Sequence, residues 1–464
     1  MGLVPINQLT TKLISVFVKK DITIIGAGLV GSLLAIYLCE KGYKVKLFER
    51  LPDMRRQKLS AGRSINLALS DRGIKALEEV GIMNEVSKIC IPMHGRFIHN
   101  ADGTTAFQPY GKQEQFINSV SRAELNKMLI DLAEKKGAEI FFNHKCEKID
   151  WDKSEITFEV ANLIPQTTDF NFLFASDGAY SAARLQHQLQ YDRFQYGQYY
   201  IDFGYKELNI PAGANGKFKM EKNALHIWPR GNFMLIALPN IDGSFTCTLF
   251  FPFDGEPSFA SLNTKEKVKA FFKRTFADAV PLMPALEDDF FNNPTSSLVT
   301  VKCYPWIRED KFALIGDAAH AIVPFFGQGM NCGFEDCSVL SKLIEEYKED
   351  WKRTLCEYQQ LRKPDADAIA ELALNNFIEM RDKVADPKFL LQKKIEAKLH
   401  EKYPRRWIPV YSQVTFNPQI RYSEALERGN KQEAIMREIM QQPDIQERWD
   451  DDNLHQQIIS QVTS

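Results

Sequence analysis

The chain has 464 residues, of which 44% are hydrophobic and 25% charged, as is usual for a globular protein. Its 58 basic and 60 acidic residues give a formal net charge of −2, so no basic field is available to hold a nucleic-acid backbone. No run of about 18 apolar residues is present to span a membrane. The eight cysteines have neither CxxC nor metal-ligand spacing. The composition therefore indicates reduced thiols, no nucleic-acid partner and no metal site.

Residues 21–50 have the pattern of a βαβ unit. The apolar residues are spaced as in a strand, a helix and a second strand, at 22–25, 29–38 and 44–49. Gly26, Gly28 and Gly31 form a G-x-G-x-x-G turn, whose backbone lets a pyrophosphate approach the start of the helix. Glu49 ends the second strand, where a carboxylate accepts hydrogen bonds from ribose hydroxyls. The pattern predicts dinucleotide binding on a parallel sheet; a purely structural turn is the alternative.

Two later stretches, 90–110 and 199–253, carry closely spaced strand signals. Within the second, residues 233–238 and 245–251 are joined by a turn at 240–243, which predicts a hairpin. We therefore expect an antiparallel sheet inserted between pieces of the parallel one.

From about residue 328 the pattern becomes helical. One apolar stripe is formed by residues at steps of three and four, namely Phe334, Cys337, Leu340, Leu343 and Ile344. Residues 355–400 continue as helix, and we expect interruptions at Pro364 and Pro387.

Three further segments carry turns that suit a cofactor. Asp177 and Gly178 lie within 175–184, and Gly316 and Asp317 precede a helical stretch. The next helix opens with a glycine-rich loop made of Gly327, Gln328, Gly329, Met330 and Asn331. Such a loop lets a flat ring approach closely, and the positive end of the helix stabilises negative charge on it. Taken singly, the Asp-Gly pair is also a common turn, and an Asp before a helix is often a cap.

Together, in this order, the segments resemble the DG and GD motifs of class A flavoprotein monooxygenases, and specifically the kynurenine 3-monooxygenase family. The resemblance runs from about residue 21 to about residue 425. It rests on segments at 62–70, 91–99, 119–129, 225–240, 245–253, 316–331, 375–384 and 408–416. It implies bound FAD, transient NADPH, O2 as co-substrate and hydroxylation of L-kynurenine at C3 through a flavin C4a-hydroperoxide.

The resemblance also implies roles for individual residues. Arg96 and Tyr110 are expected to bind the substrate carboxylate, because a guanidinium fork and a phenol are donors suited to it. The remaining substrate residues are expected to be Phe250, Phe325, Asn376, Glu379, Met380 and Tyr411. Arg50 and Arg122 join the glycines, carboxylates and loop named above as cofactor residues. No side chain is assigned as general acid or base. Without the resemblance, Arg96 is a surface charge or a structural ion pair.

The expected fold class is α/β, with a Rossmann-like FAD-binding parallel-sheet domain interleaved with an antiparallel-sheet substrate domain and followed by a C-terminal helical region. The FAD-binding domain is expected at 21–89, 111–198 and 295–345, and the substrate domain at 90–110 and 199–294, leaving 346–464 as the helical region and 1–20 as an extension.

The tail from residue 424 is polar, whereas animal members of the family end in an apolar anchor, so a bacterial, cytoplasmic enzyme is expected. His94 and Cys332 also depart from the animal sequences. Two alternatives stay open: a related hydroxylase of another aromatic acid, and a non-catalytic protein on the same fold.

Overall fold

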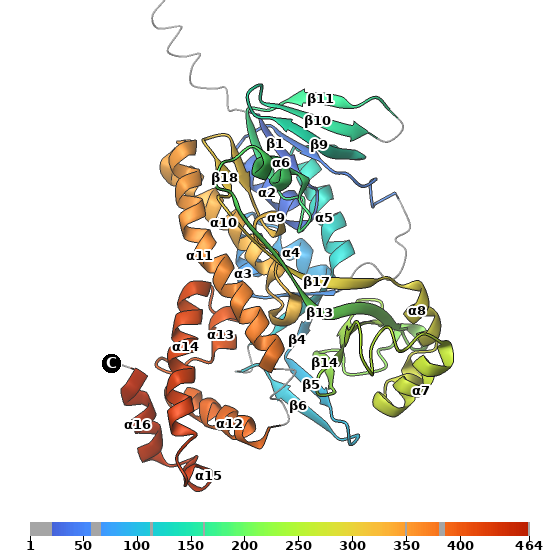
Figure 1. Cartoon of the computed structure of the whole chain (residues 1–464), viewed down its shortest axis with the longest axis vertical. Helices are drawn as coiled ribbons and strands as arrows, with labels where there is room; N and C mark the ends of the chain where they lie inside the picture. Colours follow the sequence, from blue (N-terminus) through green and yellow to red (C-terminus); the bar gives the residue numbers. More distant parts are fainter. Residues whose placement is uncertain are drawn as a thin grey trace, which may run out of the picture.

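A computed structural model of the chain describes residues 21–56, 66–111, 115–160, 163–348, 350–379 and 386–462. The predicted extension at 1–20, the first part of the 62–70 segment, and Met380 lie outside these ranges. Figure 1 shows the parallel sheet and its helices in the upper half, a larger sheet at the lower right, and the C-terminal helices at the lower left. The mixed α/β architecture predicted from the sequence is confirmed.

A six-stranded sheet in the order β18-β19-β12-β1-β2-β8 forms the centre of the upper half. Its strands are β1 (Ile22–Ile25), β2 (Val45–Phe48), β8 (Glu139–Phe141), β12 (Phe172–Ala175), β18 (Ile307–Arg308) and β19 (Phe312–Leu314). All pairs are parallel except β18 with β19. Every residue of β1 and β12 is buried, as expected for parallel strands covered on both faces. The βαβ unit predicted at 21–50 is therefore confirmed.

Helices of this upper half lie between the strands in sequence. They are α2 (Leu29–Glu40), α3 (Asp71–Glu79), α4 (Met83–Val86), α5 (Arg122–Lys135), α6 (Ala182–Leu189), α9 (Asp317–His320) and α10 (Gly329–Tyr347). Short 3₁₀ turns are η1 (Ser87–Ile89), η2 (Ala214–Gly216), η3 (Val280–Leu282) and η4 (Pro324–Phe326). The stripe predicted along the helix after residue 328 is buried on α10, where it packs in the main core with α2 and the sheet.

Two three-stranded antiparallel sheets flank the parallel one. The first consists of β3 (Asn66–Leu69), β7 (Ile117–Ser121) and β4 (Cys90–Met93). The second consists of β9 (His144–Asp150), β10 (Glu155–Val160) and β11 (Gln166–Asp169).

The lower sheet has seven strands in the order β17-β13-β16-β15-β14-β5-β6. They are β5 (Gly95–His99), β6 (Thr105–Pro109), β13 (Gln195–Ile210), β14 (Ala224–Pro229), β15 (Met234–Pro239), β16 (Phe245–Pro252) and β17 (Thr295–Tyr304). Only β14 and β5 are parallel. The predicted hairpin is β15 with β16, and its inner face packs against α7 (Lys265–Thr275) and α8 (Leu286–Asn292).

The domain boundaries predicted at 198 and 295 fall on strands of this sheet. Residue 198 lies within β13, and β17 begins at 295 and pairs along β13. The two strands cross from the parallel-sheet half to the lower half, which their separate sequence patterns do not reveal (Figure 1). We propose that β17 and all of β13 belong to the substrate domain.

In the described part of the chain, six helices follow at the C-terminus. They are α11 (Trp351–Ile378), α12 (Pro387–Lys402), α13 (Val410–Thr415), α14 (Tyr422–Ile439), α15 (Ile445–Arg448) and α16 (Asp452–Val462). Pro387 starts a helix, as a proline readily does, but the interruption expected at Pro364 is wrong, because α11 continues through it. The flanking Arg362 and Asp365 are held in buried ion pairs, which fix this part of the helix.

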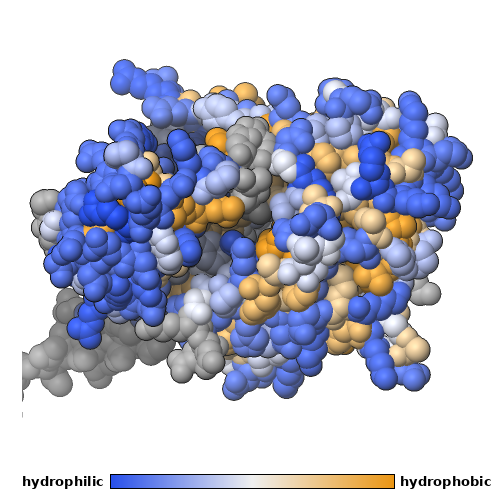
Figure 2. Space-filling view, turned by 90° about the horizontal axis from the view of Figure 1, so that it is seen from below, coloured by the Kyte–Doolittle hydropathy of each residue, from blue (hydrophilic) through white to orange (hydrophobic). Residues whose placement is uncertain are grey.

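The polar tail after residue 424 is amphipathic and not uniformly solvated. Met436, Ile439, Leu454 and Ile458 form a separate core with Trp407. Among the described residues, no helix combines the length and apolarity needed to cross a membrane. Viewed from below, apolar residues gather around a hollow in this face of the molecule, and hydrophilic residues cover much of the rest (Figure 2).

Candidate active site

Three turns meet at the carboxyl end of the parallel sheet, where ligands bind in open α/β sheets. They follow the neighbouring strands β1, β12 and β19 and contain Gly26, Asp177 and Gly316. A Cβ added to Gly26 would lie 2.7 Å from the Ser176 carbonyl oxygen, and one added to Gly316 would lie 3.0 Å from Val30 of α2. The three motifs are therefore packed against one another although about 290 residues separate the first from the last.

The centre of this junction fits a pyrophosphate. A Cβ on Gly31 would lie 2.0 Å from the Gly26 carbonyl oxygen, whereas one on Gly28 or Gly178 would meet no protein atom within 4 Å. Gly28 caps α2 without a side-chain hydrogen bond, and the first turn of α2 carries no acidic residue. Open space beside an uncapped helix start, with free N–H groups and a positive helix end, suits a phosphate.

Three carboxylates surround this space in different states. Glu49 accepts hydrogen bonds from the backbone N–H groups of Ala27 and Leu51, each at 2.9 Å. Asp177 accepts from Ser181 and, at 3.1 Å, from the N–H of Ala183. Burial outweighs these bonds and raises the pKa of Asp177 above its ordinary value.

The third carboxylate and the two predicted arginines are more open. Asp317 is exposed at the start of α9 and has no hydrogen-bond partner among the described residues, so its oxygens are available to hydroxyl groups of a cofactor. Arg50 follows β2 and Arg122 begins α5, and both side chains are exposed.

The loop before α10 is fixed mainly by its own side chains. Gly327 has a φ of +67°, and Gly329 and Met330 open α10 without an acidic first turn. Asn331 is fully buried, donates to the carbonyls of Ala68 and Gly327, each at 2.8 Å, and accepts from the N–H of Ser70 at 2.9 Å. Its side chain therefore braces the loop.

Gln328 is similarly engaged. Its Nε2 donates to Ser70 Oγ at 3.3 Å, and its Oε1 accepts from the Tyr422 hydroxyl at 2.8 Å. Sequence reasoning did not find Tyr422, because this contact joins residues 94 positions apart.

A buried ionic network lies behind the loop. Asp336 is 2.6 Å from His320 Nε2 and 2.7 Å from Arg362 Nε. Burial alone lowers the pKa of His320, but Asp336 outweighs it and holds that pKa well above its ordinary value. Likewise, burial raises the pKa of Asp336, but His320 and Arg362 bring it below its ordinary range. Ligand atoms of His320, Cys332 and Asp336 lie within 4.8 Å of one another, yet Arg362 already contacts two of these residues and balances the charge.

On the lower sheet, Arg96, Tyr110 and Tyr411 come together from β5, the end of β6 and α13. The Arg96 guanidinium lies 4.8 Å from the Tyr411 ring centroid and 5.6 Å from that of Tyr110, and the two rings stack at 5.6 Å. Among the residues that the structure describes, Arg96 has no carboxylate partner and the buried Tyr110 hydroxyl has no hydrogen-bond partner. Burial raises the pKa of Tyr110 well above its ordinary value, so the phenol remains a donor. A cation and a donor without partners together suit a carboxylate.

An aromatic group adjoins these donors. The ring of Phe325 stacks on that of Phe377, with 4.3 Å between the ring centroids, and its centroid lies 5.0 Å from that of Phe250. Tyr411 stacks on Phe326 at 5.5 Å, which links the two clusters. Phe326 and Phe377 were not predicted as site residues; Phe377 follows Asn376 directly in the sequence, which was the available signal.

The other residues predicted on α11 do not all join this group. Asn376 donates to the Phe325 carbonyl at 2.7 Å and so positions the aromatic turn. Glu379 instead lies 3.7 Å from Lys393 of α12.

The geometry fits an FAD-binding protein with a second site of anion-binding and aromatic side chains, and the comparisons support the FAD-binding class. A family model described as "FAD binding domain" matches residues 19–373, so the chain belongs to this class. Within it, the chain belongs to the kynurenine 3-monooxygenase family. It is 50% identical to the kynurenine 3-monooxygenase of Christiangramia forsetii, over 96% of this chain and 99% of that protein. It is 51% identical to the enzyme of the same name from Flavobacterium psychrophilum, with the same coverage.

The fold itself is shared more widely. A solved structure of tetrameric 2-methyl-3-hydroxypyridine-5-carboxylic acid oxygenase has a TM-score of 0.64 at 19% identity, covering 80% of this chain and 94% of that one.

Proposed function

We infer that the chain is an FAD-dependent monooxygenase that hydroxylates L-kynurenine at C3. L-Kynurenine, NADPH, a proton and O2 give 3-hydroxykynurenine, NADP⁺ and water. The relatives that span nearly the whole chain carry this activity in their name. The structural observation that supports the substrate is a pair of side chains. Among the described residues, Arg96 has no counter-ion and the buried Tyr110 hydroxyl has no hydrogen-bond partner.

The cofactor is assigned to the junction of the three turns. We propose that Gly26, Gly28, Gly31 and Gly178 cradle the pyrophosphate, that Glu49 and Asp317 accept from its sugar hydroxyls, and that the backbone of the 327–331 loop lies beside the flavin ring. Bound FAD would supply the redox chemistry, in which NADPH provides two electrons, one atom of O2 is added to the substrate ring and the other leaves as water.

The substrate residues act by binding, orienting and excluding water. Arg96 and Tyr110 hold the carboxylate, and Tyr411 covers the guanidinium. Phe250, Phe325 and Phe377 hold the aromatic ring, with Asn376 fixing Phe325. The amino group of kynurenine makes the carbon ortho to it electron-rich, so the chain needs no strong acid there. The chain contributes by orienting the substrate and by excluding water from the site.

A turnover panel tests the substrate and separates it from the alternative hydroxylase. The FAD-loaded protein is assayed with L-kynurenine, with its decarboxylated amine and with other aromatic acids. We expect L-kynurenine to be strongly preferred, and Arg96→Ala to lose about 2–5 kcal/mol of that preference. Arg274→Ala, which removes an exposed arginine on α7, is the control and should change nothing. Equal use of the decarboxylated amine by the unmodified protein would refute the carboxylate assignment.

We also propose a cytoplasmic location. All eight cysteines are free and five of them are buried, which suits a reducing compartment. Cell fractionation tests this, and recovery of the chain with membranes or outside the cytoplasm would contradict it.

A further inference from the structure

The buried side chain of Arg72 on α3 joins the two halves of the candidate site. It is 2% exposed, although arginine is rarely buried without a specific set of partners. Arg72 belongs to neither the cofactor residues nor the substrate residues assigned above.

Three of its contacts fasten one segment of the C-terminal region. Its Nε donates to the Val414 carbonyl at 3.0 Å, and its Nη2 donates to the carbonyls of Asn417, at 3.4 Å, and Ile420. The segment 414–420 follows Tyr411 on and after α13, so its place determines where Tyr411 lies.

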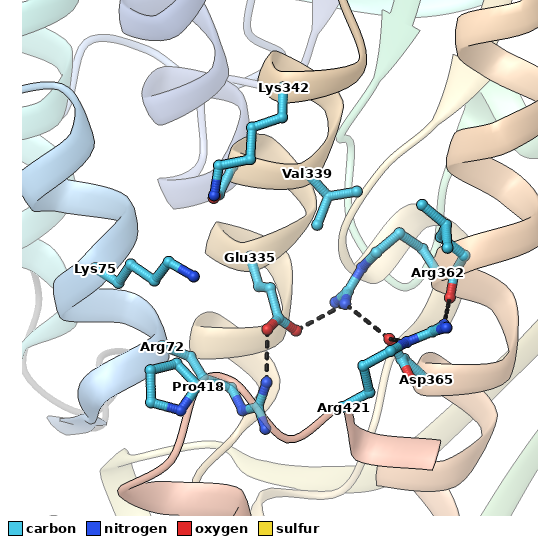
Figure 3. Close-up of a pocket in the computed structure, with 11 residues that line it drawn as sticks. Arg72, Lys75, Glu335, Val339, Lys342, Arg362, Asp365, Pro418 and Arg421 are labelled. Atoms are coloured by element: carbon cyan, nitrogen blue, oxygen red, sulfur yellow. Dashed lines mark hydrogen bonds and ion pairs between the residues drawn. The ribbon is translucent and has the colours of Figure 1, made fainter. Parts of the chain in front are cut away.

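Its other contacts reach the helix that begins at the flavin loop. Nη1 donates to Glu335 of α10 at 2.6 Å, and Glu335 also accepts from Arg362 at 2.7 Å. Figure 3 shows Glu335 between the two guanidinium groups, in the wall of a cavity of about 190 Å³. The guanidinium of Arg72 also lies 4.0 Å from the ring centroid of Tyr422, whose hydroxyl donates to Gln328.

We propose that Arg72 is a positioning residue, which sets Tyr411 against Arg96 and Tyr110 by clamping residues 414–422 to α10. This rests on the proposed function, because Tyr411 is assigned there to the carboxylate site. The planar fork donates in several fixed directions at once, which a lysine cannot reproduce. Arg72→Lys should therefore keep the charge and lose the clamp.

Steady-state kinetics of the FAD-loaded protein and hydrogen exchange together test the proposal. We expect Arg72→Lys to raise KM for L-kynurenine about tenfold with kcat within about twofold, because ground-state and transition-state binding weaken alike. We expect amide exchange to rise about tenfold at 410–422 and to stay unchanged in β1 and α2. Arg230→Lys is the control, since the half-buried Arg230 likewise donates to backbone carbonyls, but to those of Thr275, His99 and Pro229. Arg230→Lys should leave both the amide exchange at 410–422 and the KM for L-kynurenine unchanged.

Tyr422→Phe decides the matter if Arg72→Lys does not fold. It removes only the hydroxyl that links the clamp to Gln328, and we expect a KM rise of about threefold. Unchanged KM together with unchanged exchange at 410–422, in a folded Arg72→Lys or in Tyr422→Phe, would overturn the proposal. If the unmodified protein does not turn over L-kynurenine, the proposed function fails, while the exchange at 410–422 still decides the role of Arg72.

Discussion

At the scale of single residues, the two halves of the candidate site differ in how well their polar groups are satisfied. Asn331 and Asp336 hydrogen-bond to protein partners, whereas the buried Tyr110 hydroxyl has none among the described residues. Unsatisfied buried groups are costly, so a protein keeps them mainly where a ligand completes them.

The Tyr110 hydroxyl makes this testable. We expect Tyr110→Phe not to lower the stability of the free protein, because the hydroxyl makes no hydrogen bond with a described residue. The same change should raise KM for L-kynurenine roughly 10- to 100-fold, since a hydrogen bond to a charged group contributes about 1.5–3 kcal/mol. Thermal unfolding and steady-state kinetics measure the two effects. Tyr191→Phe, at an exposed tyrosine, is the control. A loss of stability with unchanged KM would mean that the hydroxyl is structural.

The His320–Asp336 pair predicts a pH dependence of stability. The pKa of His320 is raised in the folded chain. Its contribution to the free energy of unfolding is therefore complete below the pKa of the unfolded state, about 6.5, and is lost as the pH rises through the pKa of the folded state. Between these values, stability should fall by about 1.4 kcal/mol per pH unit from this group alone. Urea unfolding at several pH values between 6.5 and 8.5 measures this effect. The difference in free energy of unfolding between the unmodified chain and His320→Gln should become smaller as the pH rises. A gap that is constant with pH would show that His320 is neutral when folded.

At the scale of elements, the sequence pattern predicted those helices and strands whose position depends on neighbouring residues alone. β1, α2 and β2 lie where their spacing placed them, because hydrophobic period and glycine positions fix a βαβ unit within about 30 residues. Helix α11 was predicted less well, because buried ion pairs on both sides of Pro364 outweigh its local effect. The order of strands in the sheet could not be predicted from the sequence pattern, because β13 pairs with β17, which lies about 100 residues later in the chain.

The glycine turn before α2 gives an element-scale prediction. We expect Gly28→Ala to leave unfolding of the deflavinated protein unchanged, because its Cβ meets no protein atom, and to weaken FAD binding at least about tenfold. Gly31→Ala should instead destabilise the fold itself, because its Cβ would overlap the Gly26 carbonyl oxygen. Flavin fluorescence titration and thermal unfolding separate the two. Unaltered FAD affinity in Gly28→Ala would place the pyrophosphate elsewhere.

At the scale of the whole molecule, the candidate site is assembled from segments that no single pattern contains. The family resemblance predicted Arg96 and Tyr110 as a carboxylate-binding pair and Tyr411 among the other substrate residues, and in the structure the three side chains lie together. It did not predict Phe377, Tyr422 or Arg72, because their importance lies in contacts between the C-terminal helices and the rest of the chain.

The hydrophobic core of the C-terminal helices is separate from the main core of the parallel-sheet half. The C-terminal cluster lies around Trp407, and the main cluster lies beneath α10. Leu454→Ala should cost about 2–5 kcal/mol in the C-terminal helices and leave the temperature of flavin release unchanged, whereas Leu340→Ala should lower that temperature. Circular dichroism and flavin fluorescence during heating distinguish the two. Equal effects on flavin release would show that the two cores unfold as one.

The central claim is tested most directly by following NADPH oxidation, 3-hydroxykynurenine and peroxide together, with and without L-kynurenine, on the purified flavoprotein. We predict that L-kynurenine stimulates NADPH oxidation and that hydroxylated product matches the NADPH consumed. Stimulated oxidation that yields only peroxide would contradict the account, because L-kynurenine would then be an effector of the flavin and not its substrate.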